Sequence, residues 1–354
     1  MNELSILSAA LRTDLASFIA KAFDQLNPGT PYQPNWHIEA IAHHLTQCFE
    51  RKITRLVITV PPRHLKSIAT SVAFVAWALG RDPSLRFICV SYAQELALKH
   101  SLDARAVMES DWYRRIFPRT RIHPDRNTQL EVMTTLRGSR LATSVEGTLT
   151  GRGGNFLIID DAHKPDEALS DLRRQRVIDW VGSTLYSRLD NKAEDVIIVI
   201  QQRLHEDDLA GHFIRQNDWV HLNLPAIAED EQCIPIGYGR AQIRHPGDLL
   251  HPEREPKQTL DTIRQSVGSY NFAAQYQQRP VPQGGGIIQW LWFRTYEQRP
   301  TRQSDDLIVQ SWDTASKADE LNDYSVGLLF LIRDGCYYLL EITRKRLEYP
   351  ELRR

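Results

Sequence analysis

The pattern of apolar and polar residues divides the chain into alternating helices and strands. Residues 1–27 place apolar side chains at helical spacing as far as Asn27-Pro28-Gly29, and a second amphipathic segment covers 36–50. Short apolar runs rich in β-branched residues occupy 56–60, 86–93, 156–161 and 195–203, with helical patterns between them. Such runs are typical of buried strands, and this alternation predicts a parallel sheet with helices on both faces.

The pattern changes after Pro225. Irregular sequence is followed by one polar helix at 257–278, and residues 279–289 then hold three glycines and two prolines, as interdomain linkers do. A new β pattern covers 306–315 and 325–346, where Asp334-Gly335 between apolar runs indicates a hairpin. We therefore expect an N-terminal helical segment at 1–50, a first domain at 51–278, a linker at 279–300 and a second domain at 301–354.

Composition and charge narrow the class of protein. The chain is 42% hydrophobic and 25% charged with a net charge of -1, as ordinary soluble proteins are. Contact with nucleic acid would therefore need local basic patches, such as Arg173, Arg174 and Arg176 on one predicted helix. The four cysteines form no C-x-x-C pair, which argues against a zinc knuckle or a disulfide scaffold and favours the cytoplasm. No signal peptide or membrane-spanning apolar run is expected.

The connection after the first predicted strand carries candidate phosphate-binding chemistry. It reads Pro-Pro-Arg-His-Leu-Lys-Ser-Ile over 61–68 and leads into a helix. In a P-loop, backbone N–H groups at a helix start hold phosphates, a lysine contacts the β- and γ-phosphates, and the next Ser or Thr binds magnesium. Lys66 and Ser67 fit this order, although Leu65 replaces the usual glycine. Alone, the segment fits an ordinary strand–loop–helix connection equally well.

A second candidate motif ends the apolar run at 156–161. Asp160 and Asp161 follow four apolar residues. A carboxylate at such a strand end, beside a P-loop, holds magnesium, and its neighbour can orient and deprotonate the attacking water. Paired aspartates also cap helices, which is the alternative interpretation. The two motifs together favour an ATPase.

Four segments carry a family resemblance: VPPRHLKS, LTGRGGNFLIIDDAHK, QQRLHEDDLAG and SWDTASKADELNDYSVGLL. In this order and spacing they resemble the large terminase subunit of tailed bacteriophages and prophages, over nearly the whole chain. The resemblance implies an α/β fold: a P-loop NTPase (ASCE-type) parallel sheet flanked by helices, then an RNase H-like α/β nuclease domain. It implies a motor that uses ATP to translocate viral double-stranded DNA into a procapsid.

The same resemblance implies cofactors and partners. The cofactors are ATP with Mg²⁺ at the ATPase site, and Mg²⁺ or Mn²⁺ at the nuclease site. The partners are double-stranded DNA, the terminase small subunit, the portal protein and further copies in a homo-oligomeric ring on the capsid. The implied location is the host bacterial cytoplasm, without membrane contact.

The resemblance also assigns roles to residues of the first domain. Lys66 contacts phosphates, Ser67 and Asp160 bind magnesium, and Asp161 replaces the usual catalytic glutamate. Asp207 and Asp208 follow the pattern of relatives, or form a helix N-cap and its first-turn acid. The expected ATP-binding residues are Pro62, Arg63, His64, Leu65, Lys66, Ser67, Ile68, Trp36, His37 and Gln201.

Several of these assignments have plainer alternatives. Arg63 and Arg152 are expected to be catalytic, Arg152 as a finger on a neighbouring subunit's ATP, yet Arg152 is equally a turn residue between glycines. Trp36 and His37 are otherwise a core tryptophan and a solvated histidine. Leu65 costs roughly 1 kcal/mol or more if the loop requires a positive φ there, and nothing in a right-handed conformation.

The second predicted domain carries candidate nuclease ligands. The resemblance places metal-binding carboxylates at Asp313 and Asp323, whereas Glu341, on the second strand of the hairpin, cannot stand for the further carboxylates a two-metal site needs. About 50 residues give too few strands, so we expect a truncated nuclease domain and no DNA cleavage by this chain. The alternatives are an inactive prophage remnant, a metal-dependent nuclease with a non-hydrolysing ATPase-like scaffold, and a helicase of another lineage.

Overall fold

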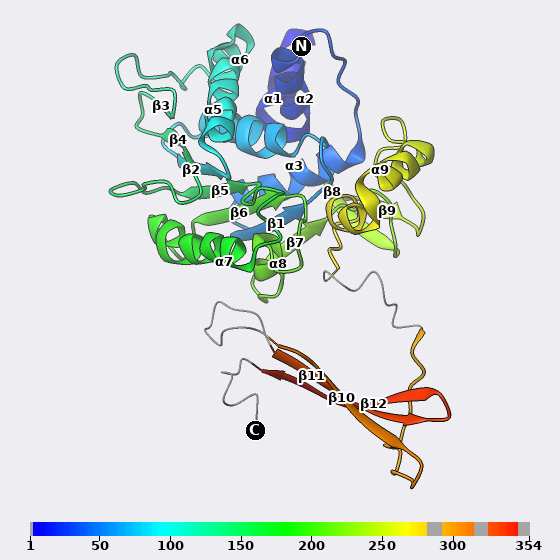
Figure 1. Cartoon of the computed structure of the whole chain (residues 1–354). Coiled ribbons are helices and arrows are strands. Elements are labelled where there is room, and N and C mark those ends of the chain that lie inside the picture. Colours follow the sequence, from blue (N-terminus) through cyan, green and yellow to red (C-terminus); the bar gives the residue numbers. More distant parts are fainter. Residues whose placement is uncertain (1–2, 282–291, 315–324, 346–354) are drawn as a thin grey trace. The chain divides into compact units, whose positions relative to one another are not determined.

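The computed structural model describes residues 3–281, 292–314 and 325–345, which fall into two compact units divided between residues 286 and 287 (Figure 1). Asp323 therefore lies outside the described residues, as does most of the predicted linker. No helix among the described residues is both long enough and apolar enough to cross a membrane.

The first unit is built around a seven-stranded sheet in the order β3-β4-β2-β5-β6-β1-β7. All neighbouring strands are parallel except β3 and β4, so the prediction of a largely parallel sheet is confirmed. The predicted runs become β1, β2, β5 and β6, while β3, β4 and β7 were not predicted. The bounds are β1 (Arg55–Thr59), β2 (Arg86–Ser91), β3 (Glu131–Met133), β4 (Ser139–Ser144), β5 (Phe156–Asp160), β6 (Val196–Gln201) and β7 (Val220–Asn223).

Helices cover both faces of this sheet, because side chains alternate across each strand (Figure 1). Leu56 and Ile58 point into the larger core and Val57 into the smaller one. The larger core is covered by α1 (Glu3–Thr13), α2 (Leu15–Leu26), α3 (Trp36–Phe49), the π-helix η1 (Ile68–Phe74), α4 (Val75–Arg81), α5 (Gln94–Glu109) and α6 (Asp111–Ile116). The smaller core is covered by α7 (Asp171–Trp180), the π-helix η2 (Val181–Leu185) and α8 (Leu209–Ile214), with the short 3₁₀ turn η3 (Tyr186–Arg188) following η2.

Two helices depart from the sequence prediction. The helical pattern at 1–27 is broken at Asp14, whose side chain caps α2 by accepting a hydrogen bond from the Ser17 N–H at 2.8 Å. The predicted helix at 257–278 is α9 (Lys257–Gln275), interrupted at Gly268, which has a φ of 79°. Between β7 and α9 lies an unpredicted hairpin of β8 (Gln232–Gly237) and β9 (Arg240–Arg244).

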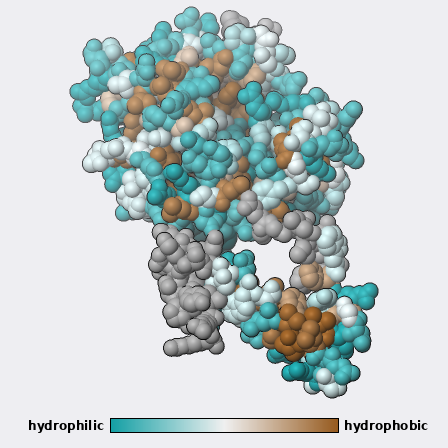
Figure 2. All heavy atoms as spheres, in the orientation of Figure 1, coloured by the Kyte–Doolittle hydropathy of each residue, from teal (hydrophilic) through white to brown (hydrophobic). Residues whose placement is uncertain are grey.

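The second unit is a three-stranded antiparallel sheet of β10 (Leu307–Asp313), β11 (Ser325–Arg333) and β12 (Cys336–Lys345). The predicted hairpin is confirmed, since Asp334 and Gly335 join β11 and β12 with positive φ angles of 49° and 75°. Figure 2 shows a compact hydrophobic patch on the visible face of these strands.

Candidate nucleotide-binding site

The connection from β1 to η1 alternates in backbone handedness. Arg63 and Leu65 have φ angles of 64° and 60°, and the residues on either side of Leu65 are not left-handed. Successive N–H groups in such an alternation form a concave nest that binds anions. Leu65 therefore occupies the left-handed conformation that favours glycine, so its cost of roughly 1 kcal/mol or more applies. The connection is therefore nest-shaped although it lacks the usual glycine.

Lys66 joins this loop to the end of β5. Its ammonium Nζ lies 2.9 Å from Oδ2 of Asp161, and both side chains are largely withdrawn from solvent. Asp161 has a φ of 49° and is held by three hydrogen bonds: its N–H to Ile200 O, its carbonyl from the Tyr92 N–H, and its Oδ1 from the Gln202 N–H. The strained aspartate is thus held in place by residues at the carboxyl ends of β6 and β2.

Asp160 is buried beside the start of η1. Its Oδ1 accepts a hydrogen bond from the Ser67 hydroxyl at 3.0 Å, and its Oδ2 accepts one from the Ser71 hydroxyl at 2.7 Å. Burial raises the pKa of Asp160 and of Asp161, while the Ser71 hydroxyl and the Lys66 ammonium oppose the rise for Asp160. The positive charge of Lys66 therefore favours the ionised form of both neighbouring carboxyl groups, whereas burial disfavours it.

The residues at this point fit a magnesium ion. Ser67 Oγ and Asp160 Oδ1 are hard oxygen donors of the kind Mg²⁺ prefers, and they lie within direct contact of each other. In the described parts of the chain, no three or more His, Cys, Asp or Glu side chains gather at metal-binding spacing. A P-loop site does not need such a group, because Mg²⁺ takes its other oxygens from water and substrate phosphates.

Gln201 ends β6 next to the P-loop strand. Its Cα is paired with that of Thr59 on β1, and its side chain is buried. Within residues 3–281, neither its amide oxygen nor its amide nitrogen has a hydrogen-bond partner. A buried amide without partners is costly, and a water or a ligand at the end of β6 would remove that cost.

A pocket of about 420 Å³ opens beside Leu65. The rings of His37, His64 and His251 surround it with centroids 5.5 to 6.3 Å apart, and Arg254 and Glu255 complete one wall. Burial lowers the pKa of His37 and brings that of His64 to about 4, so both are neutral at pH 7. His37 is therefore not the solvated histidine of the plainer alternative.

Three residues that line this pocket carry polar atoms without hydrogen-bond partners. Among the described residues, His37 Nε2, His251 Nε2 and Glu255 Oε2 are buried and accept or donate no hydrogen bond. The His64 Nδ1–H donates to Pro62 O at 2.9 Å, which leaves its Nε2 as an acceptor. The pocket thus has the partly polar lining of a small-molecule site. His251 and Glu255 follow the P-loop by more than 180 residues, and no local sequence signal marks them.

Several other predicted residues do not line this pocket. Trp36 does not line this pocket, and the Arg244 guanidinium carbon lies 5.5 Å from its ring centroid. Arg63 is exposed. Asp313 is exposed at the end of β10. Arg174 is buried and donates to Ala168 O, so it does not share an exposed basic face with the neighbouring arginines.

The acidic pair at 207–208 includes a helix cap. Asp208 caps α8 by accepting a hydrogen bond from the Gly211 N–H at 2.8 Å, and it pairs with Arg203 at 2.9 Å. Asp207 instead pairs with Arg215 at 3.1 Å. The capping alternative therefore holds for Asp208.

Arg152 lies near the amino ends of the parallel strands, whereas Lys66 lies near their carboxyl ends. Its loop leads into the amino end of β5, where Gly154 packs against the backbone of Arg86 at the start of β2. Asp160 stands at the other end of the same strands. The Arg152 side chain is 48% exposed and pairs with Glu131 at 2.7 Å. Arg152 therefore does not reach the P-loop of its own chain.

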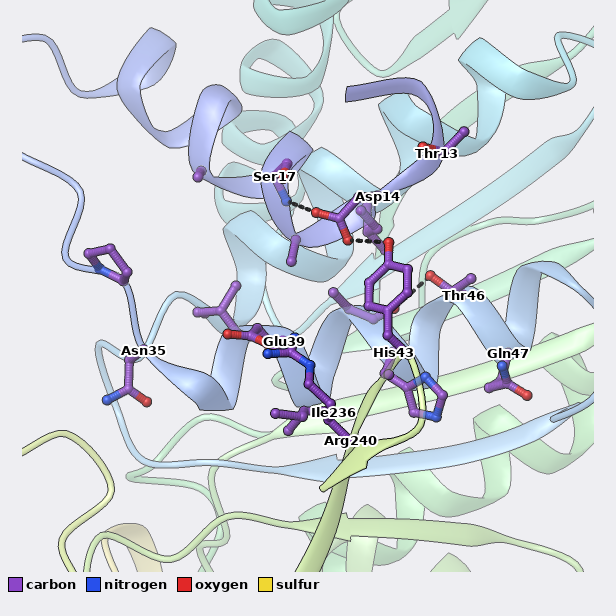
Figure 3. A pocket seen from close by; sticks show the side chains of 18 of the residues that line it. Thr13, Asp14, Ser17, Asn35, Glu39, His43, Thr46, Gln47, Ile236 and Arg240 are labelled. Carbon is purple, nitrogen blue, oxygen red and sulfur yellow. Dashed lines mark hydrogen bonds and ion pairs between the residues drawn. The ribbon is translucent and has the colours of Figure 1, made fainter. Parts of the chain in front are cut away.

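A larger pocket, of about 560 Å³, lies away from the P-loop between α2, α3 and the β8–β9 hairpin (Figure 3). The Tyr238 hydroxyl donates to Asp14 at 3.1 Å and Arg240 pairs with Glu39 at 2.6 Å, which ties the hairpin to the helices. None of the unpartnered buried polar atoms in the described residues lines this pocket. Residues with unpartnered buried polar atoms thus line the smaller pocket and not this larger one, within the described parts of the chain.

Comparison with known proteins gives structural likenesses only. No family model matches the sequence, and no curated protein matches it. The HK97 bacteriophage large terminase is similar at 12% identity and a TM-score of 0.46, over 92% of this chain and 67% of that chain. The ATPase domain of the Thermus phage P74-26 large terminase is similar at 14% identity and a TM-score of 0.48, over 73% and 97%.

Proposed function

We propose that the first unit is an ATPase that drives double-stranded DNA translocation, the motor of a large terminase subunit of a tailed bacteriophage or prophage. One observation supports this above all: Lys66 and Ser67, at the end of a nest-shaped loop, meet Asp161 and Asp160 at 2.9 and 3.0 Å. The four sequence segments that resemble this family point to the same activity.

The geometry suggests how the residues act in turn. The backbone N–H groups of 63–66 bind the β- and γ-phosphates, and the Lys66 ammonium exchanges its contact with Asp161 for a phosphate oxygen. That exchange frees the Asp161 carboxylate to orient and deprotonate the attacking water. Mg²⁺ held by Ser67 and Asp160 would neutralise phosphate charge. The nucleoside part occupies the histidine-lined pocket beside Leu65.

The partners follow from the proposed motor. We infer the terminase small subunit, the portal protein and a homo-oligomeric ring, in which Arg152 would serve a neighbouring subunit's site. For the second unit we infer a part of an RNase H-like domain with Asp313 as a ligand of Mg²⁺ or Mn²⁺. Contact with DNA would be made to phosphates, and it would weaken as salt is raised.

ATP hydrolysis with and without double-stranded DNA tests the motor. We expect hydrolysis that DNA stimulates, lost in Lys66→Ala and retained in Lys99→Ala, which removes an exposed lysine paired with Asp103. Loss of one such catalytic group typically lowers the rate by two or more orders of magnitude. A folded wild-type protein that does not hydrolyse ATP would support the inactive remnant. Metal-dependent plasmid nicking lost in Asp313→Ala would support the nuclease on a non-hydrolysing scaffold.

A further inference from the structure

A fully buried arginine lies behind the paired aspartates. Arg140 is on β4, two strands from β5, and is 0% exposed. Its Nε and Nη2 donate to the Ser71 carbonyl at 3.3 and 3.2 Å, and its Nη1 is buried with no partner in residues 3–281. Burying a guanidinium is costly unless it is paired, and Arg140 forms no ion pair with a carboxylate among the described residues, although its charge acts on Asp160 from further away. Packing alone gives no reason for an arginine here.

Ser71 connects this arginine to the site. It lies on the π-helix η1, which begins directly after Ser67, and π-helical turns are often found at functional sites. Its carbonyl accepts from Arg140, and its hydroxyl donates to Asp160 Oδ2 at 2.7 Å. The ring of His100 adds a buried nitrogen 3.6 Å from the same oxygen.

The two carboxylate oxygens of Asp160 have different partners. Oδ2 accepts the Ser71 hydroxyl on the inner side, where the His100 ring nitrogen lies 3.6 Å away and beyond hydrogen-bond distance, whereas Oδ1 accepts the Ser67 hydroxyl. Without the inner contacts, the carboxylate could rotate about its χ angles and present either oxygen. The inner contacts therefore select the orientation in which Oδ1 and Ser67 Oγ stand together.

We propose that Arg140 and Ser71 are positioning residues for the metal side of the site: Arg140 holds the backbone of Ser71, and Ser71 holds Asp160 so that one oxygen is presented with Ser67. Neither residue touches the substrate. This inference rests on the proposed function, since it assumes that Ser67 and Asp160 bind the metal that accompanies ATP. It predicts that metal affinity depends on the Ser71 hydroxyl, while the affinity for metal-free nucleotide does not.

The test measures binding rather than turnover. A fluorescent ATP analogue is titrated in EDTA and then at increasing Mg²⁺, and Mn²⁺ binding with the nucleotide is followed by electron paramagnetic resonance. For Ser71→Ala and Arg140→Gln we expect the metal half-saturation to rise about 10- to 100-fold, as for other residues that orient metal ligands. Metal-free nucleotide affinity should change less than about twofold. Ser71→Thr, which keeps the hydroxyl, should retain the metal affinity of the wild-type protein.

A matched control is Ser101→Ala on α5, a fully buried serine whose hydroxyl has no partner among the described residues. It should leave the metal half-saturation unchanged. Unchanged half-saturation in Ser71→Ala, with normal nucleotide binding, would overturn the positioning role alone. A wild-type protein that binds neither nucleotide nor metal would refute the proposed function and this inference with it. Ser71→Ala removes a single hydroxyl, so the test stands even if Arg140→Gln does not fold.

Discussion

The left-handed backbone at Leu65 leads to a sharp stability prediction. A side chain with a Cβ costs about 1–2 kcal/mol in this conformation, and Leu65 has a φ of 60°. Glycine removes that cost, but the greater entropy of its unfolded chain lowers the free energy of unfolding by about 0.5–1 kcal/mol relative to alanine. Leu65→Ala and Leu65→Gly both lose the partly buried side chain that packs on the larger core. Their difference therefore isolates the backbone, and we expect Leu65→Gly to be more stable than Leu65→Ala by about 0.5–1 kcal/mol.

Urea unfolding of the whole chain measures this difference. Tryptophan fluorescence reports on the first unit through the fully buried Trp77, and equal m-values allow midpoints to be compared. The matched control is Leu102, an exposed leucine within α5. At that right-handed position the order should reverse, with Leu102→Ala more stable than Leu102→Gly by about 1 kcal/mol.

One result would refute the reasoning. If Leu65→Ala is at least as stable as Leu65→Gly, while Leu102 shows the usual order, then residue 65 is not left-handed in solution. The alternating backbone of 63–66 would then be absent, and with it the anion nest on which the proposed phosphate binding depends.

Three further predictions concern other parts of the first unit. Burial lowers the pKa of His163 to about 4, so below about pH 6.5 the unfolded chain binds a proton that the folded protein does not. The free energy of unfolding should therefore fall as the pH drops from 6.5 to 4. In urea titrations, His163→Gln should reduce the fall between pH 6.5 and 5 by about 2 kcal/mol at most. His163 Nε2 also accepts the Leu209 N–H at 2.9 Å, which protonation would prevent. If Arg152 serves a neighbouring subunit, a mixture of Arg152→Ala and Lys66→Ala proteins should regain ATP hydrolysis that neither has alone; no gain would contradict that role. A Cβ at Gly80 would lie 2.3 Å from a carbon of a buried aromatic ring, so Gly80→Ala should lower the urea midpoint by about 1–3 kcal/mol, and an unchanged midpoint would show that the ring yields freely.

The four central strands could be predicted from the sequence because both faces of each are buried. β1, β5 and β6 are buried at every position, so they appear as continuous apolar runs. The order of strand, Lys66-Ser67 and helix is likewise local, and so is the strand that ends in paired aspartates. These features depend on neighbours along the chain, and a pattern of residues is enough to indicate them.

The tertiary structure decided what depends on contacts between distant segments. β4 escaped prediction because it reads as a polar strand, although its Arg140 is fully buried against η1. The conformation of Leu65 could not be derived either, because leucine normally avoids a positive φ and the packed surroundings have to impose it. The pocket beside the loop joins His37 on α3 to His251 and Glu255. Amino-acid order thus determined where the proposed phosphate-binding loop lies. Burial of charged and strained groups, which only the folded chain creates, determined which side chains surround that loop.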